Sequence, residues 1–227
     1  RNDVIQRTLV AFVLDESGSM RRYRERTREG VKEYIETLQK DDRPTKLKLI
    51  TFNTSGMRTV IDMEDVMNIS SMDPNFYSPS GGTPLLDAVA RGILEMDDYV
   101  AGCSEKFNVM FTIMTDGVEN ASRNFSAFQV AKMIEERETK GWIFTYLGAN
   151  QNAWSEGQKM GIKGKYASNY QHSNSKEAMR VMAESTIRAK RGWDSARKSE
   201  RFFTEDEKLR LLQKKDRPTD PYTRRSA

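Results

Sequence analysis

A chain of 227 residues has room for one α/β domain and an appended segment, and 31% charged against 37% hydrophobic residues is typical of a soluble protein. No run of about 18 apolar residues occurs, which argues against a membrane span. The single cysteine, Cys103, excludes an intramolecular disulfide and is compatible with a reducing cytoplasm. The net charge of +4 is uneven, because residues 176–227 carry 15 Lys/Arg against 9 Asp/Glu.

Apolar runs alternate with segments of helical periodicity through most of the chain. In its first part this pattern predicts a strand buried on both faces, a helix, a second strand and a short antiparallel third strand: residues 8–14, 23–39, 46–53 and 57–61. A long connection over 63–82 follows, marked by Asp-Pro, Ser-Pro and Gly-Gly.

The second part continues the alternation. Thr83 and Pro84 predict the N-cap and first residue of a helix that runs to about Tyr99. Ser126 is expected to cap the next helix, and Gly141 to end it. The remaining elements are expected as strands over 108–114, 142–147 and 166–170 and as helices over 125–140, 153–161 and 175–191. The predicted fold is α/β: a doubly wound, mostly parallel, six-stranded sheet with one antiparallel edge strand.

We place the domain at residues 1–192 and a basic C-terminal extension at 193–227. The extension has few apolar residues beyond Phe202, Phe203 and three leucines in 209–212. Thr204 and Glu207 have the spacing of a capping box. We expect a docking arm that borrows surface from the domain's flank or from another subunit, so that homo- or hetero-oligomers could form through it. A disordered solubilising tail is the alternative. Nucleic-acid binding is disfavoured, because the positive charges are interleaved with acids.

Carboxylates and hydroxyls follow two of the predicted strands. Asp15, Ser17 and Ser19 come after the first strand, Asp116 comes after the fourth, and Thr83 opens the intervening helix. Ligand sites of open α/β sheets lie beyond the carboxyl ends of strands where the strand order reverses, so these side chains are expected to meet. Hydroxyl oxygens suit a hard cation such as Mg²⁺, and the two aspartates can hold its waters and neutralise it.

The set Asp15-x-Ser17-x-Ser19, Thr83 and Asp116 resembles the metal-ion-dependent adhesion site of von Willebrand factor type A domains. The resemblance covers about residues 5–192, and the stretches 115–122, 147–153 and 202–207 are similar to stand-alone bacterial or phage-encoded members. It implies one Mg²⁺ or Mn²⁺ ion, with Ser17 and Ser19 as direct ligands.

The resemblance also implies roles for the other three residues. Thr83 would coordinate directly in the ligand-competent state and through water otherwise, while Asp15 and Asp116 would act mainly through waters. A glutamate or aspartate of another protein would complete the coordination. The predicted function is therefore cation-dependent protein binding without catalysis, at a cytoplasmic location or in a virion if the chain is phage-encoded. An adaptor subunit of an ATPase-driven machine and a structural component of a phage particle are the alternatives.

Two enzyme classes fit the sequence poorly. A serine hydrolase needs a histidine base, and the only histidine, His172, follows the last predicted strand in what we expect to be a polar surface turn removed from Ser17. A nucleotide-binding enzyme needs a glycine-rich phosphate loop, and neither Gly-x-Gly-x-x-Gly nor Gly-Lys-Ser/Thr occurs.

Overall fold

The central sheet follows from the apolar runs of the sequence. The computed structural model describes residues 6–149 and 153–214, so 150–152 of the 147–153 stretch and 215–227 of the extension lie outside the described residues. Six strands form one sheet in the order β3-β2-β1-β4-β5-β6, and only β3 runs antiparallel to its neighbour. They are β1 (Arg7–Asp15), β2 (Thr45–Asn53), β3 (Gly56–Asp65), β4 (Phe107–Thr115), β5 (Ile143–Gly148) and β6 (Ala167–Asn169). The predicted fold class is confirmed.

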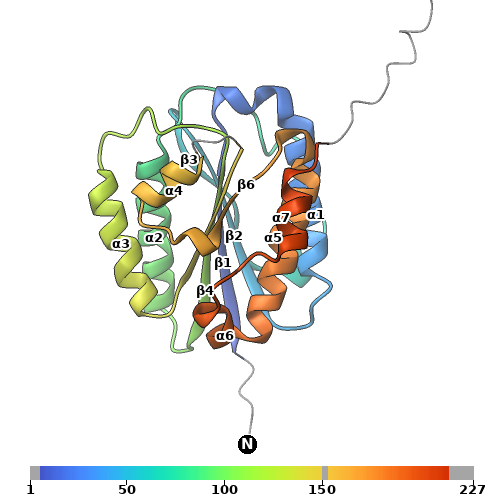
Figure 1. Cartoon of the computed structure of the whole chain (residues 1–227), viewed down its shortest axis with the longest axis vertical. Helices are drawn as coiled ribbons and strands as arrows, with labels where there is room; N and C mark the ends of the chain where they lie inside the picture. The colour runs from blue at the N-terminus through green and yellow to red at the C-terminus, as the bar shows by residue number, and fades with distance from the viewer. Residues whose placement is uncertain (1–5, 150–152, 215–227) are drawn as a thin grey trace, which may run out of the picture.

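Helices cover both faces of this sheet (Figure 1). One face carries α1 (Arg24–Leu38), α5 (Ser175–Arg191) and α7 (Glu205–Leu212); the other carries α2 (Leu85–Ala101), α3 (Ala127–Thr139) and α4 (Ala153–Lys159). The short α6 (Trp193–Lys198) lies at the end of the sheet where β1 begins. Because both faces are covered, β1 and β4 are buried along nearly their whole length, which explains their unbroken apolar sequences. None of the helices in the described residues is long and apolar enough to cross a bilayer.

The helices α1 and α5 lie unusually close together. A Cβ atom on Gly30 would stand 2.8 Å from the Met179 sulfur and 3.2 Å from the Ser175 carbonyl oxygen, so a larger residue would have to displace the Met179 side chain. Arg180 Nε donates to Glu33 Oε1 at 2.7 Å across the same contact. This packing fixes α5, and with it the segment that leads from β6 into α5, over the carboxyl end of the sheet.

The start of α2 differs from the prediction. Thr83 is not the N-cap: the helix begins at Leu85, and Pro84 occupies the capping position without a side-chain cap. The first amides are capped from another part of the chain, since Leu86 N–H donates to Glu119 Oε2 (2.9 Å) and Asp87 N–H to Ser122 Oγ (3.0 Å). Thr83 is thereby left free of a capping role.

The extension packs back on the domain over its described part, residues 193–214. Phe203 and Leu211 are fully buried, and the Gln171 amide donates to the Leu211 carbonyl at 2.9 Å. Both expected capping devices are present, at Ser126 in α3 and at Thr204 in α7. The sequence left two surfaces open for these apolar residues, the flank of this domain and another subunit. In the structure they pack on the flank of the domain, so contacts cross the expected domain boundary at residue 192.

Candidate metal centre

The five predicted site residues converge at the carboxyl edge of the sheet. Asp15 ends β1, Ser17 and Ser19 lie at the start of the 3-10 helix η1 (Gly18–Tyr23), Thr83 precedes α2, and Asp116 follows β4. Ser17 Oγ and Ser19 Oγ are 3.1 Å apart, and Ser19 Oγ donates to Asp116 Oδ1 at 2.8 Å. Ser17 is buried and Ser19 is exposed, so the cluster reaches from the sheet to the surface.

Thr83 lies next to Gly117, which also lies close to Asp15. A Cβ atom on Gly117 would stand 3.0 Å from Thr83 Oγ1 and 3.5 Å from Asp15 Oδ2, so a larger residue would crowd Thr83 and contact Asp15. The backbone of Thr83 is held by Asn120, whose side chain accepts from the Thr83 amide (2.8 Å) and whose amide donates to the Thr83 carbonyl (3.2 Å). The loop after β4 therefore fixes the backbone of Thr83 beside the site.

The two carboxylates lie in a poorly hydrated place. Asp15 has no exposed surface, and its oxygens accept hydrogen bonds from two neutral groups, the Ser17 amide and the Thr115 hydroxyl, both at 2.7 Å. Burial raises the pKa of Asp15 to about 6 and also raises the pKa of Asp116 above its usual range. A cation placed between carboxylate and hydroxyl oxygens would offset this cost, and these are the oxygens that Mg²⁺ and Mn²⁺ prefer, so the donor set fits such an ion.

A short segment that the sequence analysis did not single out is hydrogen-bonded to the loop that carries Asp15. We call residues 76–80 the strap. The Tyr77 hydroxyl donates to the Asp15 carbonyl, the Ser78 amide donates to Glu16 Oε2 (2.7 Å), and the Ser80 amide donates to the Glu16 carbonyl (2.9 Å). Arg58 of β3 joins both partners, because its Nη2 donates to Glu16 Oε2 (2.8 Å) and to the Phe76 carbonyl (2.6 Å). The loop that carries Asp15 and Ser17 is thus fixed on the side facing β3.

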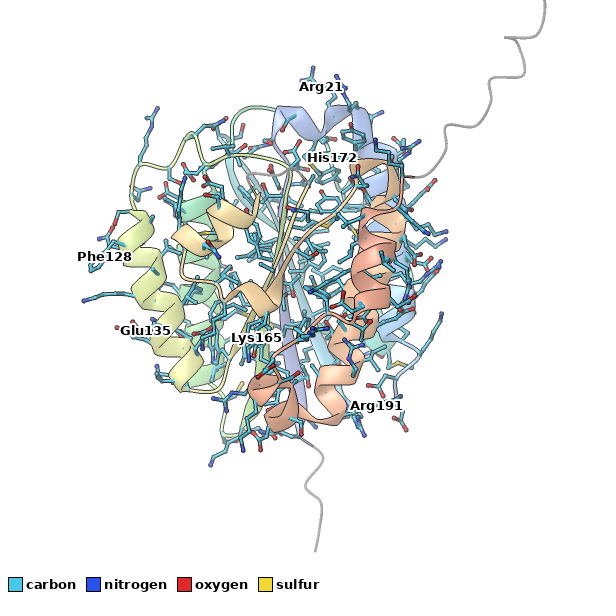
Figure 2. All side chains as sticks on the ribbon, in the orientation of Figure 1. Arg21, Phe128, Glu135, Lys165, His172 and Arg191 are labelled. Atoms are coloured by element: carbon cyan, nitrogen blue, oxygen red, sulfur yellow. The ribbon has the colours of Figure 1, made fainter. Side chains whose placement is uncertain are left out.

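The placement expected for His172 was wrong. The segment after β6 turns back over the sheet, so the ring is half-buried and its Nε2 lies 3.8 Å from Asp116 Oδ2. Burial lowers the pKa of His172 to about 4, despite the nearby Asp15 charge, which leaves the imidazole neutral near pH 7. Figure 2 shows His172 at the same end of the molecule as Arg21 of η1. Sequence spacing could not reveal this, because the contact depends on the path between β6 and α5.

A polar cleft of about 500 Å³ lies beside the cluster. It is bounded by the β2–β3 hairpin, the start of α2 and residues 120–124, and Arg91 and Arg123 line it. The one carboxylate of its lining, Asp87, accepts hydrogen bonds from the amides of Arg123, Asn124 and Phe125. The cleft therefore has two exposed guanidinium groups and a carboxylate whose acceptor capacity is already used.

Comparison with known proteins agrees with this architecture. The sequence model of the von Willebrand factor type A domain matches residues 10–184, and the chain belongs to that family. No curated protein matches the chain.

Solved structures share the fold at low sequence identity. A von Willebrand factor type A protein from Catenulispora acidiphila is 16% identical (TM-score 0.61), with 80% of this chain and 43% of that chain covered. The pilus adhesin SpaC of Lactobacillus rhamnosus GG, in its open conformation, is 14% identical (0.66; 82% and 30% covered). Manganese-loaded Plasmodium vivax TRAP protein is 17% identical (0.54; 79% and 74%). The chain thus spans less than half of the first two proteins.

Proposed function

We propose that this chain is a protein-binding module whose binding depends on one divalent cation, Mg²⁺ or Mn²⁺, at the candidate metal centre. Ser17 and Ser19 would contact the ion directly, and Thr83 would do so when a partner is bound. Asp15 and Asp116 would act mainly through water molecules. The observation that carries the proposal is the convergence of three hydroxyls above two buried carboxylates at the edge of the sheet.

The chemistry of this donor set indicates the kind of partner. Hydroxyls that contact a cation do not neutralise it, so a carboxylate supplied from outside gains a strong interaction. Among the described residues, no group of three or more His, Cys, Asp or Glu side chains is placed to hold an ion, so the chain itself offers few charged ligands. We therefore expect weak cation binding alone and stronger binding when an aspartate or glutamate of another protein is present.

Two neighbours in structure support the proposal without deciding it. One is an adhesin and the other is loaded with manganese, but both share only the fold with this chain. Catalysis is not part of the proposal. In the part of the chain that the structure describes, no imidazole is hydrogen-bonded to Ser17 Oγ, which lies 3.1 Å from Ser19 Oγ, so we expect Ser17 to lack the histidine base of a nucleophilic serine. We expect no turnover of esters or ATP that depends on Ser17.

Capture of partners in the presence and absence of the ion tests the function. Bait protein would be incubated with lysate in Mg²⁺ or in chelator, and bound proteins would be identified by mass spectrometry. Mn²⁺ binding would be measured in parallel by water-proton relaxation. Ser19→Ala should lose both the captured partner and Mn²⁺, whereas Ser104→Ala, an exposed serine at the opposite end of the sheet, should lose neither. Equal Mn²⁺ binding by wild type and Ser19→Ala would refute the site.

A further inference from the structure

His172 is held rigidly beside the candidate metal centre by two aromatic rings. Its imidazole stacks on Tyr23 of η1 with ring centroids 4.1 Å apart and planes 6° apart. The Tyr170 ring meets it edge-on at 5.6 Å. Tyr23 follows the serine turn and Tyr170 follows β6, so the ring is fixed by the site loop on one side and by the sheet on the other.

Neither nitrogen of this imidazole makes a hydrogen bond within the described part of the chain. Nδ1 is buried without a hydrogen-bond partner, and the nearest recorded acceptor of Nε2, Asp116 Oδ2, lies at 3.8 Å, beyond hydrogen-bond reach. Buried polar atoms are normally satisfied, and leaving one unsatisfied typically costs about 1–3 kcal/mol. A ligand bound at Nε2 would leave Nδ1 unchanged, so the case for Nε2 as a ligand atom rests on the fixed ring and on its position 3.8 Å from Asp116 Oδ2.

The geometry allows one ion to reach both His172 and Asp116. Two atoms bound to the same ion at about 2.1 Å each can lie no more than about 4.2 Å apart, and Nε2 and Oδ2 satisfy that limit. The other oxygen of Asp116 accepts from Ser19 Oγ, so the imidazole and the Ser19 hydroxyl approach the two oxygens of the same carboxylate.

We propose that His172 Nε2 is a nitrogen ligand of the cation and that it biases the site toward Mn²⁺, Co²⁺ and Zn²⁺ over Mg²⁺. The inference rests on the proposed cation site. It goes beyond that site by adding a nitrogen ligand and a selectivity, and by making Asp116 a direct ligand, in place of its water-mediated role, when a transition metal is bound. Imidazole is a good ligand for first-row transition metals, whereas Mg²⁺ prefers oxygen donors and keeps its water. The pair of one nitrogen and one carboxylate, together with hydroxyls, would make the site responsive to the supply of transition metals.

Affinities for single metals measure this bias. Mg²⁺ and Co²⁺ would each be titrated into the full chain by calorimetry, for wild type and for His172→Phe, which keeps the ring stack and removes the nitrogens. We expect His172→Phe to lose at least about tenfold in Co²⁺ affinity while Mg²⁺ affinity changes less than about twofold. Tyr23→Phe, which keeps the stacking ring and lacks only the hydroxyl, should preserve the wild-type Co²⁺/Mg²⁺ ratio. An unchanged ratio in His172→Phe, or an equal loss of both metals, would overturn the proposal.

A second measurement avoids substitution. Because the chain has one histidine, a long-range ¹H–¹⁵N spectrum of the labelled protein contains a single imidazole. Saturation with Zn²⁺ should shift the Nε2 resonance strongly and leave the proton on Nδ1, whereas unchanged nitrogen shifts in Zn²⁺-bound protein would overturn the ligand role. If the wild type binds none of these metals, the proposed function itself fails. If Ser19→Ala abolishes metal binding while the Zn²⁺-bound wild type shows no nitrogen shift, only the His172 ligand fails.

Discussion

Asp15 carries its charge where water does not reach it. Its carboxylate has no exposed surface and is hydrogen-bonded by a backbone amide and a hydroxyl rather than by a cationic side chain. Burial of such a group favours its neutral form, as the raised pKa of about 6 reflects. The residue that is best placed to attract a cation therefore lowers the stability of the protein when no cation is bound.

Asp15→Asn should stabilise the metal-free protein while abolishing Mn²⁺ binding. Removing the buried charge is expected to raise the free energy of unfolding at pH 7 by roughly 1–3 kcal/mol, measured by urea denaturation in chelator. Asp87→Asn is the matched control and should have the opposite sign. That carboxylate accepts three backbone amides, which outweigh its partial burial and lower its pKa. Destabilisation by both substitutions would contradict the argument.

Arg58 should affect cation binding without touching the ion. It links Glu16 to the strap, so Arg58→Gln frees the loop that carries Asp15 and Ser17. We expect Mn²⁺ affinity to fall by about three- to tenfold in relaxation titrations, with a smaller change in melting temperature. Arg7→Gln breaks another arginine–glutamate pair, with Glu105 at the opposite end of the sheet, and should leave the affinity unchanged. Equal effects of the two variants would exclude a positioning role.

At the scale of elements, the sequence predicted the strands well and the contacts between loops poorly. The runs at 8–14 and 108–114 are apolar because β1 and β4 are covered on both faces. Their composition therefore predicts that they are central strands of the sheet. The five site residues follow from the same rule, since loops after parallel strands share one edge of the sheet.

The failures have a common physical origin. Thr83 was expected to cap α2, but Glu119 and Ser122 supply the caps from a loop more than 30 residues away. His172 was expected far from Ser17, but the chain after β6 crosses back over the sheet. The strap lay in a connection without periodicity, and no pattern in the sequence indicated that its aromatic pair, Phe76 and Tyr77, lies in the core. Contacts of this kind depend on chain paths, which local patterns do not encode.

The helix α7 should contribute stability that depends on pH. Burial alone would raise the pKa of Glu207, but hydrogen bonds from Arg188 and from the Thr204 amide outweigh it and hold the pKa below the usual range. A lowered pKa means that the contribution is fully present above the unfolded pKa of about 4.3 and is lost as pH falls through the lower folded value. At pH 7 the free energy of unfolding of the wild type should exceed that of Glu207→Gln by about 1–2 kcal/mol. Urea denaturation should show this difference disappearing below about pH 4. A gap independent of pH would contradict the assignment.

For the whole molecule, the described part of the extension behaves as structure. Phe202, Phe203 and Leu211 are buried against the domain, and Arg188 of α5 holds Glu207 of α7. A chain ending at Gly192 should therefore unfold more easily, by at least about 3 kcal/mol, because several apolar side chains lose their partners. If the chain ending at Gly192 is as stable as the full chain, the extension is an appendage that does not stabilise the domain.

The position of β1 has a consequence for synthesis of the protein. β1 leaves the ribosome before both of its neighbours, β2 and β4, yet it lies between them in the sheet, and its partner Phe107 in β4 comes 100 positions after Arg7 in the chain. The Asp15 carboxylate likewise cannot accept its hydrogen bond from the Thr115 hydroxyl until β4 has been synthesised. A nascent chain must therefore shield a strongly apolar strand until about 100 further residues have been made. No cation can assist that stage, because the oxygens that would hold it come together only when β4 has joined the sheet.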